Sequence, residues 1–193
     1  KIKKMKIFKY ALLAIPFLYF SCSDDDDTPE LPNEEEVITT MIVTLTANDG
    51  SADVVLQTQD LDGEGGEDPA VTVSGPISNM TSYSGSIQWL NEMEDEPEDI
   101  TIEVLAEDDE HQVFFSIGEG LPVQVIYTDE DGNGNPIGVN FILAPTEAGI
   151  TGSGSLTVTL VHQPLKPNDG DLALALSEEG SIDIETSFDV VVE

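Results

Sequence analysis

The clearest signal of the fold is the sequence Ser82-Tyr83-Ser84-Gly85-Ser86-Ile87-Gln88-Trp89-Leu90. Tyr83, Ile87 and Trp89 fall on one side of an extended chain, and the serines and Gln88 fall on the other, because successive side chains of a strand point to opposite faces. This period of two is typical of a half-buried β-strand. The stretch therefore predicts a strand with one apolar face, which a second layer has to cover.

The same alternation recurs along the chain. In residues 181–193, Ile182, Ile184 and Phe188 alternate with Asp183 and Glu185. Glycine, asparagine and aspartate gather between such stretches, as they do in hairpin turns. Further strands are predicted at Ile38–Thr46, Ala52–Thr58, Ala70–Ser74, His111–Ile117, Pro122–Thr128, Gly138–Leu143 and Leu156–Val161. Together they predict an all-β fold, an antiparallel, immunoglobulin-like β-sandwich.

One segment, residues 97–108, departs from this pattern. Pro97 fits the first turn of a helix, and the acidic residues after it suit the positive helix end. The alternation of Ile100, Ile102 and Val104 favours a strand instead. Of the two interpretations we prefer one short helix.

The first residues have the layout of an export signal. Lysines come first, then an apolar run over Ala11–Phe20, then Ser21 and Cys22. The run is shorter than the ~20 residues of a membrane-spanning helix, so residues 1–21 predict a secretory signal peptide. Cys22 is the only cysteine, and a lone thiol outside the cell is reactive. We therefore expect Cys22 to be lipidated; the alternative is an ordinary signal residue or a free thiol.

Domain organisation follows from composition. Residues 22–36 are rich in aspartate, glutamate and proline, which predicts a disordered acidic tether. Residues 37–193 have the length of one domain, the predicted β-sandwich.

The charge is extremely one-sided. The formal net charge is −33, every acidic residue follows Cys22, and Lys166 is the only cationic residue after it. Such a chain repels nucleic acid and bare anionic membranes, so we expect no nucleic-acid partner and membrane contact only through the lipid anchor. Its self-repulsion is relieved by salt or by bound cations.

Two acidic loops are candidates for calcium binding. In residues 129–136, oxygen-bearing side chains alternate at Asp129, Asp131, Asn133 and Asn135, as at the start of a calcium loop. A second, weaker candidate loop contains Asp60, Asp62 and Glu64. The alternative is that both are plain hairpin turns, which use the same residue types.

The two histidines suggest a different kind of site. His111 opens one predicted strand and His162 closes another, each in step with the apolar residues of its strand. If these strands are antiparallel neighbours, both imidazoles meet at one rim of the sandwich. Imidazole suits zinc, copper and iron. The sequence alone nevertheless favours two hydrogen-bonded histidines without a ligand over a transition-metal site.

Catalysis has little support in the sequence. It contains no Ser/His/Asp motif, nucleophile elbow, phosphate-binding glycine loop or HExxH motif. Carboxylates are so abundant that a pair of them carries no information. We therefore expect a protein that is not an enzyme.

Residues 5–27 resemble the leader of outer-membrane lipoproteins of the Bacteroidota. The residues after Cys22 resemble the acidic signal that moves such lipoproteins to the outer face of the membrane, and they are Ser23, Asp24, Asp25, Asp26 and Asp27. Four later segments resemble a family of small surface lipoproteins of that phylum, residues 33–40, 59–63, 109–112 and 132–138. Its members often carry the label "type 1 periplasmic binding fold superfamily protein". That label implies two α/β lobes, whereas the strand pattern predicts a β-sandwich.

Anchor, charge and resemblance together imply a lipoprotein of the outer membrane, exposed at the cell surface. We expect a binding or accessory module that presents a metal ion or small ligand to an outer-membrane transporter. The alternative is a calcium-stabilised structural or adhesive module. The first expectation depends on the rim histidines, and the second on the acidic loops.

Overall fold

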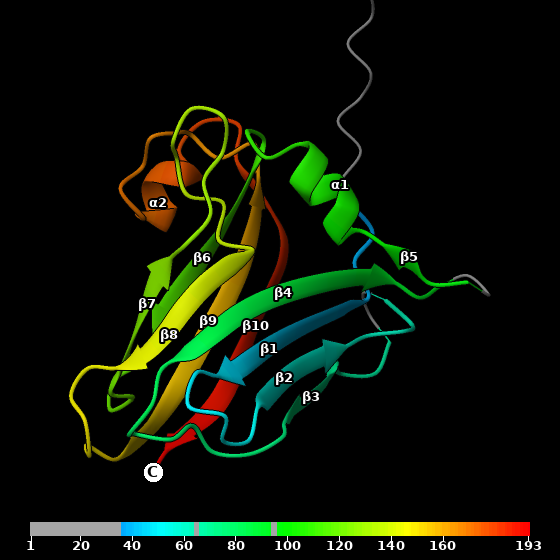
Figure 1. Ribbon diagram of the computed structural model, residues 1–193. Helices are drawn as coiled ribbons and strands as arrows, with labels where there is room; N and C mark the ends of the chain where they lie inside the picture. The colour runs from blue at the N-terminus through cyan, green and yellow to red at the C-terminus, as the bar shows by residue number, and fades with distance from the viewer. Residues whose placement is uncertain (1–35, 64–65, 94–95) are drawn as a thin grey trace, which may run out of the picture. The chain divides into compact units, whose positions relative to one another are not determined.

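The computed structural model describes residues 36–193, apart from residues 64–65 and 94–95. Within this part of the chain, ten strands and two short helices form two antiparallel sheets (Figure 1). The predicted signal peptide, Cys22, the export signal Ser23–Asp27 and Glu64 lie outside the described residues. No helix among the residues described has the length and apolar character needed to cross a membrane.

The larger sheet has the strand order β3-β2-β1-β4-β8-β7, with β5 paired beside β4. Its strands are β1 (Thr40–Ala47), β2 (Val54–Gln59), β3 (Ala70–Val73), β4 (Tyr83–Asn91), β5 (Glu98–Asp99), β7 (Val123–Tyr127) and β8 (Asn140–Pro145). The stretch 82–90 is therefore β4, a central strand that pairs with both β1 and β8. Its apolar side chains Tyr83, Ile87 and Trp89 are all buried, as the alternation predicts.

The smaller sheet has the order β10-β9-β6. Its strands are β6 (His111–Ile117), β9 (Gly152–His162) and β10 (Ser181–Val192). A short helix, α2 (Leu172–Ala175), packs on this sheet through Ala175, which contacts Phe114 and Val161. The two antiparallel sheets confirm the predicted all-β sandwich.

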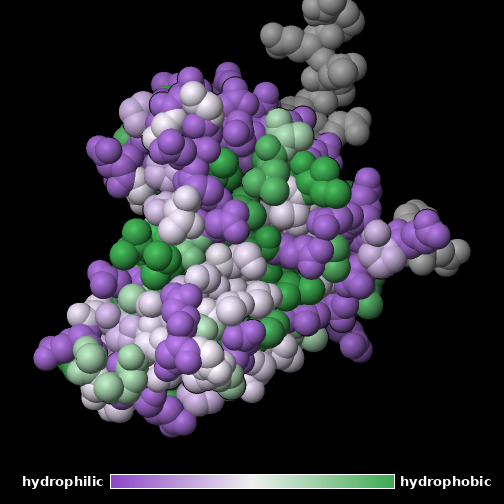
Figure 2. All heavy atoms as spheres, in the orientation of Figure 1, coloured by the Kyte–Doolittle hydropathy of each residue, from purple (hydrophilic) through white to green (hydrophobic). Residues whose placement is uncertain are grey.

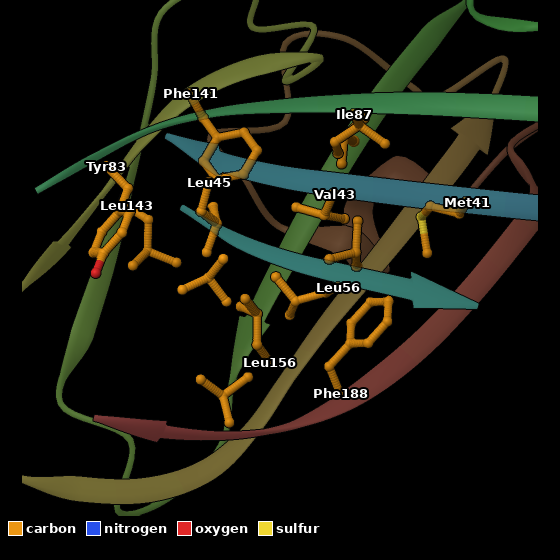
Figure 3. Close-up of a cluster of buried hydrophobic side chains, with 14 of the residues drawn as sticks. Met41, Val43, Leu45, Leu56, Tyr83, Ile87, Phe141, Leu143, Leu156 and Phe188 are labelled. Atoms are coloured by element: carbon orange, nitrogen blue, oxygen red, sulfur yellow. The ribbon is translucent and has the colours of Figure 1, made fainter. Parts of the chain in front are cut away.

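The core lies between the sheets. Val43, Leu45 and Leu56 of the larger sheet face Leu156 and Phe188 of the smaller one (Figure 3). Each of these side chains is fully buried, and full burial of such a side chain stabilises a fold by about 1.5–3 kcal/mol. Apolar burial therefore holds the sheets together.

Gly85 interrupts the apolar face of β4 for a steric reason. It pairs with Phe141 of β8, and the Phe141 ring occupies the space of a Gly85 side chain, 2.3 Å from where a Cβ would stand. A larger residue here would displace a fully buried aromatic ring.

The preferred helix over 97–108 is present but shorter, as α1 (Thr101–Ala106). Glu98 and Asp99 pair with the end of β4 as the strand β5, so the helix begins after them and Pro97 lies outside it. Ile102 and Leu105 are exposed on α1, and hydrophobic residues appear there in the space-filling view (Figure 2). Further hydrophobic residues are visible on the same face, between hydrophilic ones (Figure 2).

Candidate metal centre

The two histidines meet at one rim of the sandwich. His111 is the first residue of β6 and His162 the last of β9, and they are direct partners across the antiparallel pair. Their rings stack with centroids 4.6 Å apart and an interplanar angle of 20°. The start of β6, the end of β9 and α1 lie at the same end of the sandwich (Figure 1). The strand parity thus correctly predicts that the imidazoles come together.

Two carboxylates join the imidazoles. Glu36 Oε1 lies 3.0 Å from His111 Nε2, and Glu36 Oε2 lies 3.5 Å from His162 Nδ1. Asp183 Oδ1 lies 3.9 Å from His162 Nδ1. One ligand atom from each of these four residues lies within 4.8 Å of every other. We call this set of four residues the inner site.

Asp183 reaches the inner site because of a β-bulge. Residues on either side of Asp183 pair with adjacent residues of β9, so Asp183 is the extra residue of the bulge. The period of two predicts Ile182 inward and Asp183 outward, yet Ile182 is 43% exposed and the Asp183 side chain is fully buried. Bulges are common next to functional sites, where they redirect a side chain.

Glu36 comes from the opposite side of the sandwich. It precedes β1 of the larger sheet, while His111, His162 and Asp183 lie on β6, β9 and β10 of the smaller one. The composition places Glu36 in the tether, but in the structure its side chain is only 5% exposed and contacts both histidines. The inner site therefore connects the two sheets at their rim.

The inner site holds polar atoms with unmet bonding capacity. The His162 ring is 3% exposed, and neither of its nitrogens has a hydrogen-bond partner among the residues that the structure describes. In the same part of the chain, Glu36 Oε2 is also buried without a hydrogen bond. Most buried polar atoms in proteins are hydrogen-bonded, and an isolated one is costly. A cation in the inner site would be a partner for one His162 nitrogen and for Glu36 Oε2.

The contacts of His111 fix how its ring can be used. The Glu107 carbonyl oxygen lies 3.1 Å from His111 Nδ1, and a carbonyl only accepts, so Nδ1 donates the hydrogen bond. In the neutral ring, Nε2 then carries a lone pair, and it lies 3.0 Å from Glu36 Oε1. Two acceptors at that distance need a proton or a metal ion between them. Metal-bound histidines usually donate their other N–H in this way to a carbonyl or carboxylate.

Electrostatics in the site favour positive charge. Burial disfavours the charged form of Glu36, but the hydrogen bond with His111 holds the pKa of the Glu36 carboxyl below its usual value. Burial also opposes protonation of His111, but its contacts with Glu36 and the Glu107 carbonyl raise the pKa of His111 above the ordinary value. The lowered pKa of Glu36 and the raised pKa of His111 both indicate that this rim of the sandwich favours a positive charge.

The spacing of the inner site suits a four-coordinate ion. Ligand atoms around a tetrahedral zinc ion lie about 3.3 Å apart when each is about 2.0–2.1 Å from the metal. The nitrogen–oxygen distances of 3.0, 3.5 and 3.9 Å in the inner site bracket that value. One ligand atom from each of the four residues lies within 4.8 Å of the others, so two nitrogens and two oxygens can converge on one ion if the side chains move closer together.

The loop 129–136 uses its carboxylates differently. Asp131 is buried and accepts hydrogen bonds from the backbone of Asn133 and Asn135. Lys166 Nζ lies 3.1 Å from Asp131 Oδ2 and also donates to the carbonyls of Asp108 and His111. The one cationic side chain after Cys22 thus already neutralises this carboxylate.

The hydrogen bonds of Asp131 have a clear electrostatic effect. Burial works against its charge, but the bonds from Asn135 and Lys166 hold the pKa of the Asp131 carboxyl far below its usual value. Asp129 accepts from the backbone of Gly138 and Asn140. These contacts tie the loop to β8 and to the loop that holds Lys166.

In the other predicted calcium loop, Asp60 and Asp62 cap their own turn. Asp60 Oδ1 accepts from the backbone of Gly63, and Asp62 Oδ2 accepts from the backbone of Glu67. Among the described residues, the two groups of three or more histidines and acids placed for one ion both contain His162. Neither includes a residue of the two acidic loops.

Sequence reasoning missed Glu36, Asp183 and Glu107. The composition of residues 22–36 hides Glu36 among similar acids, and the alternation in 181–193 assigns Asp183 to the wrong face. Nothing in the sequence around Asp183 predicts the β-bulge. Glu107 follows α1, in the acidic run that ends at His111.

Comparisons with known proteins add no assignment. No family model, no curated protein and no solved structure matches this chain. The function therefore has to be argued from the geometry of the site.

Proposed function

We propose that this chain is a transition-metal-binding module, which holds one ion between Glu36, His111, His162 and Asp183. The observation that supports it most strongly is that two imidazoles and two carboxylates meet in a buried place, where neither ring nitrogen of His162 has a hydrogen-bond partner among the described residues. One bound ion would serve as a partner for a His162 nitrogen and for Glu36 Oε2, and would remove the cost of burying those two atoms unpaired.

The donor set selects the class of ion. Imidazole nitrogens suit zinc, copper and iron, whereas calcium and magnesium prefer oxygen ligands alone. Zinc is usually four-coordinate and tetrahedral, and it accepts both histidine nitrogen and carboxylate oxygen as ligands. We therefore take zinc as the ion of first choice.

Burial of the ligands supports binding rather than catalysis. The four side chains are at most 5% exposed, so a substrate has no route to the ion. Catalytic zinc sites keep one position open to water or substrate. The module would hold or hand over its ion without transforming a second molecule.

We also propose where in the cell the module is located. A lipid anchor at Cys22 and the acidic signal at Ser23–Asp27 support attachment to the outer membrane with the domain at the cell surface. There the module would present its ion to an outer-membrane transporter. Labelling with a palmitate analogue tests the anchor, because Cys22→Ala should abolish incorporation.

Calorimetric titration with zinc tests the metal site. At about 0.15 M salt, where exposed charges are screened beyond about 8 Å, the wild-type protein should bind zinc with saturation and calcium far more weakly. Asp183→Asn should lower the zinc affinity by more than the roughly 10–100-fold that loss of an outer-shell partner costs.

Asp189→Asn is the matched control, because it makes the same change on an exposed residue of the same strand. It should leave the zinc affinity unchanged. Equal losses in both variants would show that zinc binds the acidic surface without a defined site. Absence of binding by zinc, copper and iron would reject the proposed function.

A further inference from the structure

A second group of ligand atoms shares His162 with the inner site. Glu107, Glu110 and His162 each offer one atom, and these atoms lie within 4.8 Å of one another. We call these three residues the outer site. We propose that the outer site binds a second divalent ion of the zinc class from solvent, through His162 Nε2. This inference rests on the proposed function, since both sites use the same imidazole.

The two nitrogens of His162 face different groups. Nδ1 lies 3.5 Å from Glu36 Oε2 and 3.9 Å from Asp183 Oδ1, whereas Nε2 lies 3.8 Å from Glu110 Oε2. Within the described part of the chain neither nitrogen has a hydrogen-bond partner, and the ring is 3% exposed. The imidazole is therefore a buried polar group, aimed by one nitrogen into the inner site and by the other into the outer site.

The backbone fixes the outer carboxylates beside this ring. Glu110 N donates to the Glu107 carbonyl at 2.9 Å, which closes the turn after α1. Gln163 N donates to the Glu110 carbonyl at 2.6 Å, which ties that turn to the residue after His162. These backbone hydrogen bonds hold the turn that carries Glu107 and Glu110 beside His162.

Exposure distinguishes the two sites. The Glu110 side chain is 50% exposed, in contrast to at most 5% for the four inner ligands. Three protein ligands leave room for water on the ion, as in open zinc sites. The outer site therefore meets solvent ions first and should hold them more weakly than the inner site.

Sharing one imidazole has a chemical requirement. A neutral imidazole has one N–H and one lone pair, so an ion at each nitrogen requires the N–H proton to leave to solvent. Metal binding to protein ligands generally releases protons in this way. Loss of that proton adds to the cost of the second ion, which again makes the outer site the weaker one.

Equilibrium dialysis of the full chain against zinc, with metal analysis, measures the number of ions bound at saturation. The wild-type protein should bind two ions per chain. Glu107→Gln and Glu110→Gln should each bind one, because the inner ligands are unchanged. Asp109→Asn, an exposed acid of the same turn, should still bind two. His162→Gln should weaken both steps, because it removes the shared ring.

Each result decides between the two claims. One ion in the wild-type protein, removed by Asp183→Asn, would overturn the outer site and leave the proposed function intact. Two ions in both glutamine variants would also overturn it, because the second ion would then lie elsewhere. No saturable zinc binding would reject the proposed function together with this inference. Circular dichroism of each variant checks that the β-fold is retained.

Discussion

Zinc should stabilise the folded domain by an amount that its measured affinity fixes in advance. The four inner ligands come from the segment before β1 and from β6, β9 and β10, and they lie at residues 36, 111, 162 and 183. An unfolded chain does not hold residues so far apart in sequence around one ion. Zinc should therefore bind only the native state, and its binding energy should appear fully as stability.

The size of the stabilisation by zinc follows from the binding equilibrium, because zinc binds only the folded state. At a free zinc concentration one hundred times the inner-site Kd, the stabilisation should be about 2.7 kcal/mol. A domain of this size gains about 2–4 °C in Tm per kcal/mol. Thermal unfolding followed by circular dichroism should thus show a rise of roughly 5–11 °C.

A variant with lower zinc affinity tests the same relation between affinity and stabilisation. If Asp183→Asn lowers the affinity about one hundredfold, the same free zinc concentration equals its Kd and should add only about 0.4 kcal/mol. Asp189→Asn should keep the wild-type shift. A wild-type Tm that does not move at one hundred times the calorimetric Kd would refute the reasoning, because the ion would then bind folded and unfolded chains alike.

Three further predictions concern the internal cation and the core. Lys166→Met should cost about 3–5 kcal/mol in urea unfolding, because it leaves Asp131 buried without its cation; a loss below about 1 kcal/mol would contradict this. Because the folded-state pKa of Asp131 is lowered, its contribution is present above the unfolded pKa of about 3.9 and is lost as the pH falls. Asp131→Asn should therefore be less stable than wild type at neutral pH, and the difference should shrink in acid; a constant difference would argue against the pair. Gly85→Val should cost at least about 1–3 kcal/mol through collision with Phe141, and Ser86→Val on the opposite face should cost less, whereas equal losses would argue against the collision.

Alternation along the sequence predicts strands well wherever one face is buried. The strand predicted at residues 111–117 is β6, with the same bounds. The strand predicted from Gly138 begins two residues later, at Asn140, because Gly138 has a φ of 89° and lies against the Tyr127 ring. A left-handed backbone does not continue a strand.

The glycine-rich start of β9 shows where composition misleads. Residues 152–155 resemble a flexible linker, yet they extend β9 by four residues beyond the predicted start at Leu156. A Cβ on Gly152 or Gly154 would stand 2.3 or 2.9 Å from the backbone of Gly120 or Glu119. Glycine is used here because two backbones approach closely, which alternation does not report.

The candidate site was only half predictable for similar reasons. Parity and antiparallel pairing are local rules, and they bring His111 to His162. Asp183 depends on one extra residue in β10, and Glu36 on how the start of the chain's described part meets the opposite sheet. Likewise α2 is short, and its main signal is the side chain of Asp171, which accepts from the backbone of Ala173 and Leu174. Such features arise from tertiary contacts, not from periodicity.

The burial of Lys166 has a consequence for digestion. Trypsin cuts after lysine and arginine, and Lys166 is the only such residue after Cys22. It is followed by Pro167, a bond that trypsin does not cut readily, and its side chain is 8% exposed. The folded domain should therefore resist trypsin-like proteases, and its peptide mapping needs an enzyme that cuts at acidic residues.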